Sequence, residues 1–425
     1  MKTKVSEDFL ERGLIENVSH EELKEKLDGE SLAFYCGYDP TAKSLQIGNL
    51  FAVVTMKRLQ LAGHKPYVLV GGATGMIGDP SGKSAERNLL DEKTLQDNIN
   101  GQTQQLKKLL DFTGDNAAVV VNNFDWMSGF SYLEFLRDVG KRFRLSEMLA
   151  KDSVKSRLNS DAGISYTEFS YQILQAYDFA YLSKHHDVCL QIGGGDQWGN
   201  ITAGIDLTRK LHSKQAYGMV IPLVTDGNGK KFGKSEGGST IFLDPDMTSP
   251  YQMYQYLMNS DDLSVIQYLK YFTFLSLEEI SKLEAITKET PHLREAQKVL
   301  AKEVTLYVHG QEGLDSAMQA TQFFFGGKIE NISDKEVHSI FADVPSIELK
   351  KDDLDQELNV LDMLAQTPLF KSKGEARRSV TQKGVYINNN TIEAVDYMVS
   401  SSDLASESSL VLRKGKKNYC VVTFK

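Results

Sequence analysis

Residues 32–49 read LAFYCGYDPTAKSLQIGN. The apolar run from Leu32 to Tyr38 is typical of a buried strand, and Pro40 interrupts it. Helical periodicity follows from Ser44 to Leu61. Small residues and amide side chains therefore stand where the predicted helix begins, so that a nucleotide could lie close to the backbone there. The stretch predicts one strand–turn–helix unit of a nucleotide-binding sheet.

The same alternation continues beyond this stretch. Further strands are predicted at 67–70, 117–121 and 188–192, and further helices at 91–112 and 196–211. Strands that alternate with helices indicate an α/β fold with a parallel sheet, here a Rossmann-type nucleotide-binding domain. Glycine-rich turns at 71–75 and 193–195 follow strands. Both turns should therefore lie at the carboxyl edge of the sheet, where ligands bind.

The pattern changes after residue 225, which predicts several domains. We expect a Rossmann-type catalytic domain at 1–225 and a lysine-containing loop at 226–247. Residues 248–328 show only helical periodicity and predict an all-helical domain. Residues 329–357 are acidic and poor in apolar residues, which predicts a linker, and 358–425 resemble a small α+β module.

The bulk composition excludes several classes of protein. The chain has 425 residues and a net charge of -9, so an RNA partner would need local basic patches. Its three cysteines are isolated in the sequence, which predicts neither a disulfide framework nor a metal site. We find no apolar run long enough to span a membrane and no signal peptide, and therefore expect a cytoplasmic protein.

Two lysine-bearing segments could meet phosphate groups. They read Gly82-Lys83-Ser84 and Lys231-Phe232-Gly233-Lys234-Ser235. A P-loop would need a glycine five residues before its second glycine, but those positions hold Ile77 and Asn228. Both segments are therefore either turns at the surface or mobile cations that act where polyphosphate charge develops.

A predicted helix around Tyr171 carries a polar stripe. Tyr171, Gln175 and Asp178 are spaced i, i+4, i+7, so they share one face of the helix. This face could be solvated, or it could line a pocket for a small zwitterion. Asp196 follows three glycines and could either cap its helix or accept hydrogen bonds from a ribose, and the same alternatives apply to Asp39.

Basic residues are concentrated in the last module of this acidic chain. One further basic cluster lies at 141–144. Such runs are usually solvated faces, but their concentration in one module favours RNA contact there. The candidate RNA-binding residues are Lys371, Lys373, Arg377, Arg378 and Lys416.

Taken together, the motifs resemble the bacterial tyrosyl-tRNA synthetases, a family of class I aminoacyl-tRNA synthetases. The resemblance runs nearly end to end. It rests on five segments in order, at 35–41, 72–84, 166–178, 191–200 and 231–235. It implies a homodimer and a C-terminal module similar to a small-subunit ribosomal protein.

The resemblance also implies a two-step reaction. L-Tyrosine would react with ATP to give tyrosyl-adenylate and pyrophosphate, and the tyrosyl group would then pass to the terminal ribose of tRNA(Tyr). Mg²⁺ would accompany ATP and pyrophosphate without a dedicated protein site. The alternatives are a tryptophan-specific synthetase, a non-catalytic RNA-binding relative, and adenylyl transfer to another carboxylate.

Three sets of site residues follow from the resemblance. The tyrosine-binding set is Tyr35, Asp79, Tyr171, Gln175, Asp178 and Gln197. The ATP-binding set is Cys36, Gly37, Asp39, Gly48, Gly194, Asp196 and Lys234. The catalytic set, which would stabilise charge on the phosphates, is Thr41, Gln46, Asn49, Lys83, Arg87, Lys231 and Lys234.

One signature of the family is altered in this chain. The start of its first long helix usually reads His-Ile-Gly-His, but here it reads Gln46-Ile47-Gly48-Asn49. Amide groups can present N–H donors in place of the imidazoles, and neutral donors suffice to stabilise phosphate charge. We expect activity to be kept without the pH sensitivity of an imidazole, and weakened catalysis is the competing hypothesis.

Overall fold

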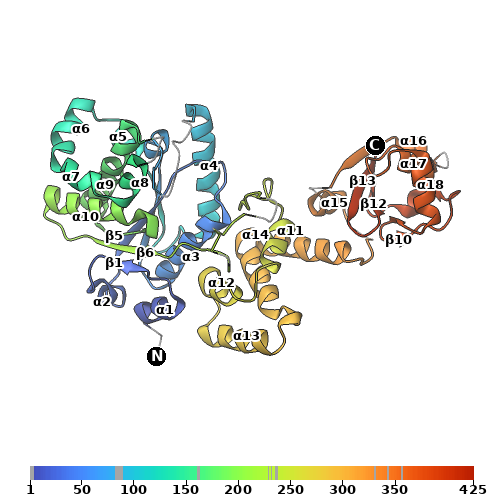
Figure 1. Ribbon diagram of the computed structural model, residues 1–425, viewed down its shortest axis with the longest axis horizontal. Helices are drawn as coiled ribbons and strands as arrows, with labels where there is room; N and C mark the ends of the chain where they lie inside the picture. The colour runs from blue at the N-terminus through green and yellow to red at the C-terminus, as the bar shows by residue number, and fades with distance from the viewer. Residues whose placement is uncertain are drawn as a thin grey trace. The chain divides into compact units, whose positions relative to one another are not determined.

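The computed structural model describes residues 4–81, 90–159, 163–227, 229–230, 232–234, 238–329, 332–341, 344–355 and 358–425. The chain forms two compact units (Figure 1). The first unit comprises Met1–Met247 and Met258–Val304, and the second comprises Thr248–Leu257 and Thr305–Lys425. Among the described residues, no helix is long and apolar enough to cross a membrane.

A six-stranded sheet forms the centre of the first unit, in the order β1-β6-β5-β2-β3-β4. The short strand β1 (Asn17–Val18) pairs antiparallel with β6. The remaining strands are parallel: β2 (Ala33–Tyr38), β3 (Lys65–Val70), β4 (Val119–Asn122), β5 (Val188–Gly194) and β6 (Tyr217–Ile221). This confirms the predicted parallel α/β sheet. The chain turns outward from β2 in one direction and from β5 in the other, so the topological switch point lies between these strands.

Helices cover the sheet of the first unit. The N-terminal part contains α1 (Val5–Arg12), α2 (Leu23–Leu27), α3 (Ile47–Leu61) and α4 (Glu92–Leu109). Between β4 and β6 follow α5 (Phe124–Met127), α6 (Tyr132–Asp138), α7 (Leu145–Leu149), α8 (Asp152–Leu158), α9 (Tyr166–His186) and α10 (Trp198–His212). Helices α12 (Val265–Phe272) and α13 (Leu277–Glu289) and the first part of α14 (Glu295–Phe324) complete the unit. Short 3-10 turns lie at η1 (Thr74–Met76), η2 (Gly140–Arg142), η3 (Gly195–Gln197) and η4 (Pro291–Leu293).

Helix α3 begins at Ile47, three residues later than its sequence pattern predicts. The Ile47 N–H donates to the Ile241 carbonyl, and the Leu243 N–H donates to the Leu45 carbonyl. A distant segment therefore holds residues 45–46 in an extended form, and tertiary pairing overrides the helical periodicity there.

A buried ion pair fixes the beginning of α9. The Arg157 guanidinium donates to both carboxylate oxygens of Glu168, at 3.0 and 2.7 Å, and both side chains are only 2% exposed. Arg157 Nε also donates to the Gly163 carbonyl at 3.0 Å. Because a buried charge without its partner is strongly destabilising, the pair joins α8 to the first turn of α9.

The second unit contains a five-stranded sheet in the order β10-β9-β12-β13-β7. Its strands are β7 (Ser346–Leu349), β9 (Val385–Ile387), β10 (Asn390–Thr391), β12 (Ser409–Lys414) and β13 (Asn418–Phe424), and β8 (Leu358–Asn359) pairs separately with β11 (Met398–Val399). Its helices are α11 (Pro250–Met258), α15 (Asp334–Ile340), α16 (Lys351–Asp355), α17 (Val360–Ala365) and α18 (Lys373–Thr381), with the turn η5 (Ser401–Asp403). Helix α14 (Glu295–Phe324) is interrupted at Gly310, whose φ of 69° is outside the helical range.

The segment 329–357, predicted to be a linker, instead contains α15, β7 and α16. Strand β7 pairs in parallel with β13, from Ser346 beside Val421 to Leu349 beside Phe424. The apolar residues of this segment are few, but Val337, Ile340 and Phe341 are all buried. Because this segment is acidic and poor in apolar residues, its sequence did not predict that it forms part of the C-terminal fold.

Candidate functional site

Two unpaired polar atoms mark the switch point of the sheet. Tyr35 on β2 lies beside Gln191 on β5, so their side chains share one face of the sheet. The Tyr35 hydroxyl and the Gln191 amide oxygen are both buried, and neither has a hydrogen-bond partner among the described residues. Leaving such a group unpaired costs about 1–3 kcal/mol. A ligand that supplies polar groups here would remove this cost.

Asp178 on α9 is a buried carboxylate in the same part of the unit. Its side chain is 1% exposed, and it accepts hydrogen bonds from Trp126 Nε1 at 2.9 Å and Asn123 Nδ2 at 3.0 Å. Burial raises the pKa of Asp178 to about 7, although both donors lower it. Burial, followed by the negative charge of Asp178, raises the pKa of Tyr35 well above its ordinary value. The two residues predicted to face a phenol are therefore close enough to interact.

A chain of hydrogen bonds connects Asp178 with Asp39 at the end of β2. Asn123 Nδ2 donates to Thr74 Oγ1 at 3.0 Å, and the Thr74 hydroxyl donates to Asp39 Oδ1 at 2.8 Å. The Tyr171 hydroxyl donates to the other oxygen of Asp39, at 2.8 Å. A side chain at Gly71 would overlap both Asp39 and Thr74, which explains the glycine at that position. These hydrogen bonds fix the side chains of Tyr171 and Asp178, which lie at the two ends of one stripe of α9.

A second polar cluster lies beside Tyr171. Gln197 Nε2 donates to Asp79 Oδ2 at 2.7 Å, and Gln175 Nε2 donates to Gln197 Oε1 at 3.2 Å. Asn200 Nδ2 donates to the Gln175 amide oxygen at 2.9 Å. The negative charge of Asp79 contributes, after burial and Asp39, to the raised pKa of Tyr171. Carboxylate and amide oxygens in this arrangement can accept hydrogen bonds from an ammonium group.

The structure thus brings all the predicted tyrosine-binding residues into two adjoining groups. It also adds residues that the sequence analysis did not single out. These are Thr74, Asn123, Trp126, Gln191 and Asn200. Of these residues, only Gln191 could have been noticed from the sequence around it, because it is a glutamine in an otherwise apolar strand.

The beginning of α3 presents neutral donors to solvent. Thr41, Gln46 and Asn49 are all exposed. The Gln46 backbone N–H donates to Asn49 Oδ1 at 3.0 Å. The amide oxygen of Asn49 is therefore engaged, and its NH₂ group is the end available to an anion at the helix N-terminus.

The loop that bears Lys234 reaches this helix N-terminus. The Ile241 N–H donates to the Gly233 carbonyl at 3.0 Å, and Ile241 in turn accepts from Ile47. A side chain at Gly233 would lie 3.3 Å from Ile47 Cγ2, so the loop backbone packs closely on α3. Lys234 is exposed beside this contact. Lys83, Arg87 and Lys231 lie outside the described residues.

Most of the predicted nucleotide-binding residues lie at or near the carboxyl ends of β2 and β5, whereas Gly48 lies in the first turn of α3 and Lys234 in its loop. Cys36 is buried, which raises its pKa to about 11, and Gly37 beside it is exposed. Gly194 ends β5, and a side chain there would lie 2.8 Å from Asp196 Oδ1. Helix α10 begins at Trp198 with Gln197 at its cap, so Asp196 does not cap it. The exposed Asp196 carboxylate lies in η3 at the ligand-binding edge of the sheet.

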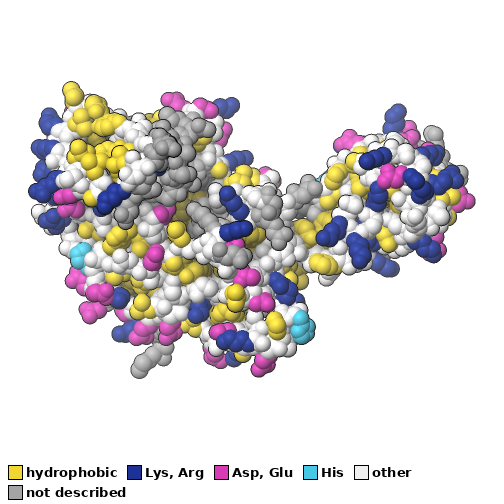
Figure 2. Space-filling model, viewed as in Figure 1, with side chains coloured by type: hydrophobic (Ala, Val, Ile, Leu, Met, Phe, Trp, Pro, Cys, Tyr) yellow, Lys and Arg dark blue, Asp and Glu magenta, His cyan; other side chains and the backbone are white. Residues whose placement is uncertain are grey.

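The candidate RNA-binding residues are exposed on the second unit. Four of them lie on α18 or just before it, and Lys416 lies in the turn between β12 and β13. Lys373 Nζ pairs with Asp362 at 2.5 Å. Figure 2 shows Lys and Arg side chains over this unit, with acidic residues among them. Among the described residues, no group of His, Cys, Asp or Glu is placed to hold a metal ion.

Comparisons with known proteins agree with this geometry. The family model described as tRNA synthetases class I (W and Y) matches residues 27–326, and the model of the tyrosine–tRNA ligase SYY-like C-terminal domain matches residues 336–422. The chain is 49% identical to a tyrosine–tRNA ligase of Rhodopirellula baltica, over 98% of this chain and 95% of that protein. It is also 49% identical to tyrosine–tRNA ligase 1 of Bacillus subtilis, over the full length of both.

A solved structure of a tyrosyl-tRNA synthetase is also similar to this chain. The C-terminally truncated mitochondrial tyrosyl-tRNA synthetase of Aspergillus nidulans superimposes with a TM-score of 0.68 at 31% identity. The match covers 76% of this chain and 94% of that protein. The fold, both family models and full-length relatives thus agree, and the chain belongs to the bacterial tyrosine–tRNA ligase family of class I aminoacyl-tRNA synthetases.

Proposed function

We propose that this chain is a tyrosine-specific aminoacyl-tRNA synthetase that activates L-tyrosine with ATP and transfers it to tRNA(Tyr). The observation that carries the proposal is the buried, unpaired Tyr35 hydroxyl in the neighbourhood of the buried Asp178 carboxylate. A phenol can donate its hydroxyl hydrogen to Asp178 and accept one from Tyr35. Phenylalanine would leave these groups unpaired, and tyrosyl-tRNA synthetases are the standard example of discrimination by this means.

The second polar cluster fits the rest of the amino acid. The α-ammonium group of tyrosine would donate to Asp79, Tyr171 and Gln175, and Gln197 completes this end of the pocket. Gln197 already holds Asp79 and Gln175 by hydrogen bonds, and Asp39 holds the Tyr171 hydroxyl. The pocket is therefore preorganised and orients the tyrosine carboxylate toward the nucleotide edge of the sheet.

Activation is an in-line displacement at ATP. A carboxylate oxygen of tyrosine forms a bond to the α-phosphorus as the bond from phosphorus to the bridging oxygen breaks, and pyrophosphate leaves with its Mg²⁺. Negative charge accumulates on the leaving group, so catalysis requires positioned donors and cations. Thr41, Gln46 and Asn49 supply donors from the beginning of α3, and Lys234 supplies charge from its loop. We assign Lys83, Arg87 and Lys231 to the same task from the sequence.

The ATP ribose and adenine would lie at the carboxyl ends of β2 and β5. Cys36, Gly37, Asp39, Gly48 and Gly194 border this edge, and Asp196 would accept hydrogen bonds from ribose hydroxyls.

In the second step, the terminal ribose hydroxyl of tRNA attacks the tyrosyl carbonyl and releases AMP. Lys371, Lys373, Arg377, Arg378 and Lys416 are the proposed contacts to RNA backbone, and the cytoplasm is the proposed location.

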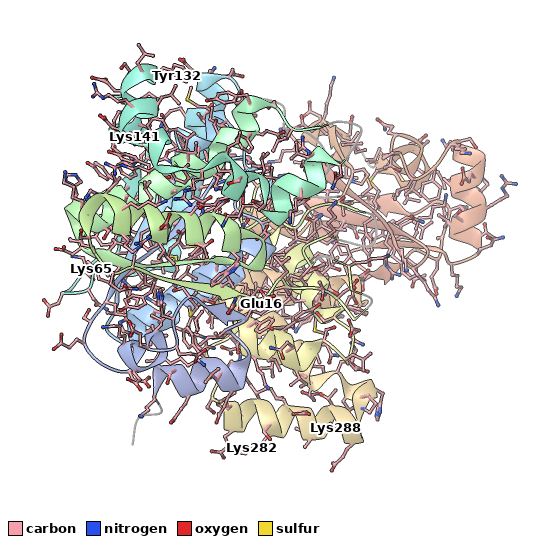
Figure 3. All side chains as sticks on the ribbon, turned by 60° about the vertical axis from the view of Figure 1, so that its left-hand side comes forward. Glu16, Lys65, Tyr132, Lys141, Lys282 and Lys288 are labelled. Atoms are coloured by element: carbon pink, nitrogen blue, oxygen red, sulfur yellow. The ribbon has the colours of Figure 1, made fainter. Side chains whose placement is uncertain are left out.

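A homodimer is the proposed assembly. Several large apolar side chains are exposed between β4 and α9, and Figure 2 shows apolar side chains gathered over α5 and α6. They are Phe124, Tyr132, Leu133, Leu145, Leu149, Leu158 and Tyr166. Figure 3 shows Tyr132 at the outer edge of this region, near Lys141. Exposed apolar surface of this kind is typical of a protein–protein interface.

The alternatives are not favoured. The class I family model covers both tryptophan and tyrosine enzymes, but the curated relatives and the C-terminal family model are tyrosine–tRNA ligases. A non-catalytic RNA-binding relative would have no need of the complete polar pocket around Tyr171 and Asp178. The exchange reaction described next separates these possibilities.

The first test is amino-acid-dependent ATP–pyrophosphate exchange with tyrosine, phenylalanine and tryptophan in parallel. We expect rapid exchange with tyrosine and exchange with the other two at least about 1,000-fold weaker in kcat/KM, because neither can pair with Tyr35 and Asp178. Exchange driven by tryptophan would identify a tryptophan enzyme. RNA binding without any exchange would support the non-catalytic alternative.

The pKa of Asp178 predicts a pH dependence of tyrosine binding. A phenol that donates to Asp178 stabilises its ionised form, so bound tyrosine lowers the pKa from the value of about 7 in the free protein. The affinity for tyrosine is therefore at its full value above pH 7. It falls by up to about tenfold per pH unit as the pH drops below 7. The KM for tyrosine should rise in this range while the KM for ATP, measured in parallel, does not follow it. A tyrosine KM that is constant from about pH 5.5 to 8 would contradict the assignment.

The altered helix signature is tested by substitution of Gln46. If the Gln46 amide donates to a charged phosphate in the transition state, Gln46→Ala should slow adenylate formation about 10- to 100-fold and leave the tyrosine Kd unchanged. Gln46→His should restore much of the rate and introduce a pH dependence below the ordinary imidazole pKa of about 6.5, because the helix N-terminus disfavours the protonated form. Gln96→Ala, an exposed glutamine on α4, is the matched control. An undiminished rate in Gln46→Ala would remove Gln46 from the site.

The dimer is tested by a charge in the apolar surface. Leu133 is 76% exposed, and Leu133→Asp should convert a dimer to a monomer in analytical ultracentrifugation. Leu263 is 87% exposed but lies outside this surface, so Leu263→Asp should stay dimeric. A monomeric parent protein, or a dimer unaffected by Leu133→Asp, would argue against this interface.

A further inference from the structure

The loop that carries Lys234 contains a single large apolar residue. Residues 226–240 read DGNGKKFGKSEGGST, in which Phe232 stands among glycines, lysines and small polar residues. Gly229, Gly233 and Gly238 have φ values of 76°, 104° and 81°, which other residues adopt only with strain. Phe232 is therefore the one residue of this sequence that can bury a large apolar side chain.

Phe232 packs against two other rings, which belong to a larger group of aromatic side chains. Its side chain is 6% exposed and packs against Phe272 and Tyr268 of α12, with ring centroids 5.1 and 4.7 Å apart. Phe272 contacts Phe51 of α3 edge to face, and Phe51 stacks on Tyr271. We call Phe51, Phe232, Tyr268, Tyr271 and Phe272 the aromatic cluster. It connects the loop with α3 and α12.

Backbone hydrogen bonds fix the chain on both sides of Phe232. Before it, the Phe232 N–H donates to the Val224 carbonyl at 3.0 Å, and the Tyr268 hydroxyl donates to the Thr225 carbonyl at 2.9 Å. After it, the Gly233 carbonyl accepts from Ile241. The Phe232 carbonyl itself lies 3.7 Å from where a side chain at Gly48 would be. The anchored ring therefore brings the loop backbone against the helix N-terminus that presents Gln46 and Asn49.

We infer that Phe232 is a positioning residue for adenylate formation, because its ring anchors the lysine loop in the aromatic cluster and so places Lys234 beside the N-terminus of α3. The Lys234 side chain is exposed, so the anchored backbone is what limits where its ammonium group can go. The same rings leave the tyrosine pocket untouched, since Tyr35, Tyr171 and Asp178 have other partners. The inference rests on the proposed role of Lys234 in stabilising the leaving pyrophosphate.

The test compares Phe232→Ala, Phe232→Leu, Lys234→Ala and the double variant Phe232→Ala/Lys234→Ala in the full-length protein. Single-turnover adenylate formation gives the rate, and tyrosine binding is measured separately. Phe232→Ala should slow adenylate formation about 10- to 100-fold with the tyrosine Kd changed less than about twofold, because misplacement by about 1 Å costs rate and not ground-state binding. Phe232→Leu keeps an apolar anchor and should recover most of the rate.

Tyr271→Leu is the matched control. It removes a ring from the same cluster but one that stacks on Phe51 and not on Phe232. It should lower the melting temperature as Phe232→Ala does and leave the rate of adenylate formation within about twofold of the parent. An equal loss of rate in Tyr271→Leu would show that general destabilisation, and not the anchor, controls the rate.

The double variant tests whether Phe232 acts through Lys234. Once Lys234 is absent, the part of the effect of Phe232 that acts through Lys234 is lost. Phe232→Ala should therefore slow adenylate formation by a smaller factor in the Lys234→Ala background than in the parent protein. Multiplied losses, or an unchanged rate in Phe232→Ala, would overturn the inference. Absence of tyrosine-dependent exchange in the parent protein would instead refute the proposed function, so the two failures are distinguishable.

Discussion

The buried negative charge of Asp178 is the constraint on which the catalytic unit depends. A carboxylate away from water is costly unless hydrogen bonds and nearby partners offset the loss of hydration. Its donors, Asn123 and Trp126, come from the turn and helix after β4, whereas Asp178 itself is on α9. Asn123 also donates to Thr74 in the turn after β3. Three segments distant in the sequence must therefore be in register before this charge is stabilised.

The two halves of the proposed site are built differently, in keeping with what each must do. The tyrosine half is largely buried, and its side chains are held in two adjoining hydrogen-bonded groups. Such rigidity favours discrimination, because a wrong amino acid leaves polar groups unpaired. The phosphate half is exposed and includes a glycine-rich loop. Groups that act mainly on charge developing in the transition state need access to the phosphates of ATP, which an exposed position gives them.

Periodicity and turn residues predicted the parallel sheet and the edge where the site lies, because both follow from local sequence. Helical spacing placed Tyr171, Gln175 and Asp178 on one stripe, and the structure places them so. The partners of that stripe could not be found in the same way. Asn123, Trp126 and Thr74 meet Asp178 and Asp39 only through the packing of β3, β4 and α9, and their own sequence neighbourhoods carry no signal of it. The late start of α3 and the strand β7 have the same cause, since both depend on pairing with distant segments.

The change from histidines to Gln46 and Asn49 is understandable from where these residues lie. The N-terminus of a helix carries partial positive charge, which disfavours a second positive charge on an imidazole. A histidine at the beginning of α3 would therefore act chiefly as a neutral N–H donor. An amide provides the same kind of donor without a titratable proton. Asn49 Oδ1 accepts the Gln46 N–H, and this contact orients the Asn49 amide so that its NH₂ group faces outward. In the proposed mechanism, the helix N-terminus thus keeps its hydrogen-bond donors to phosphate, with side chains that do not change charge with pH.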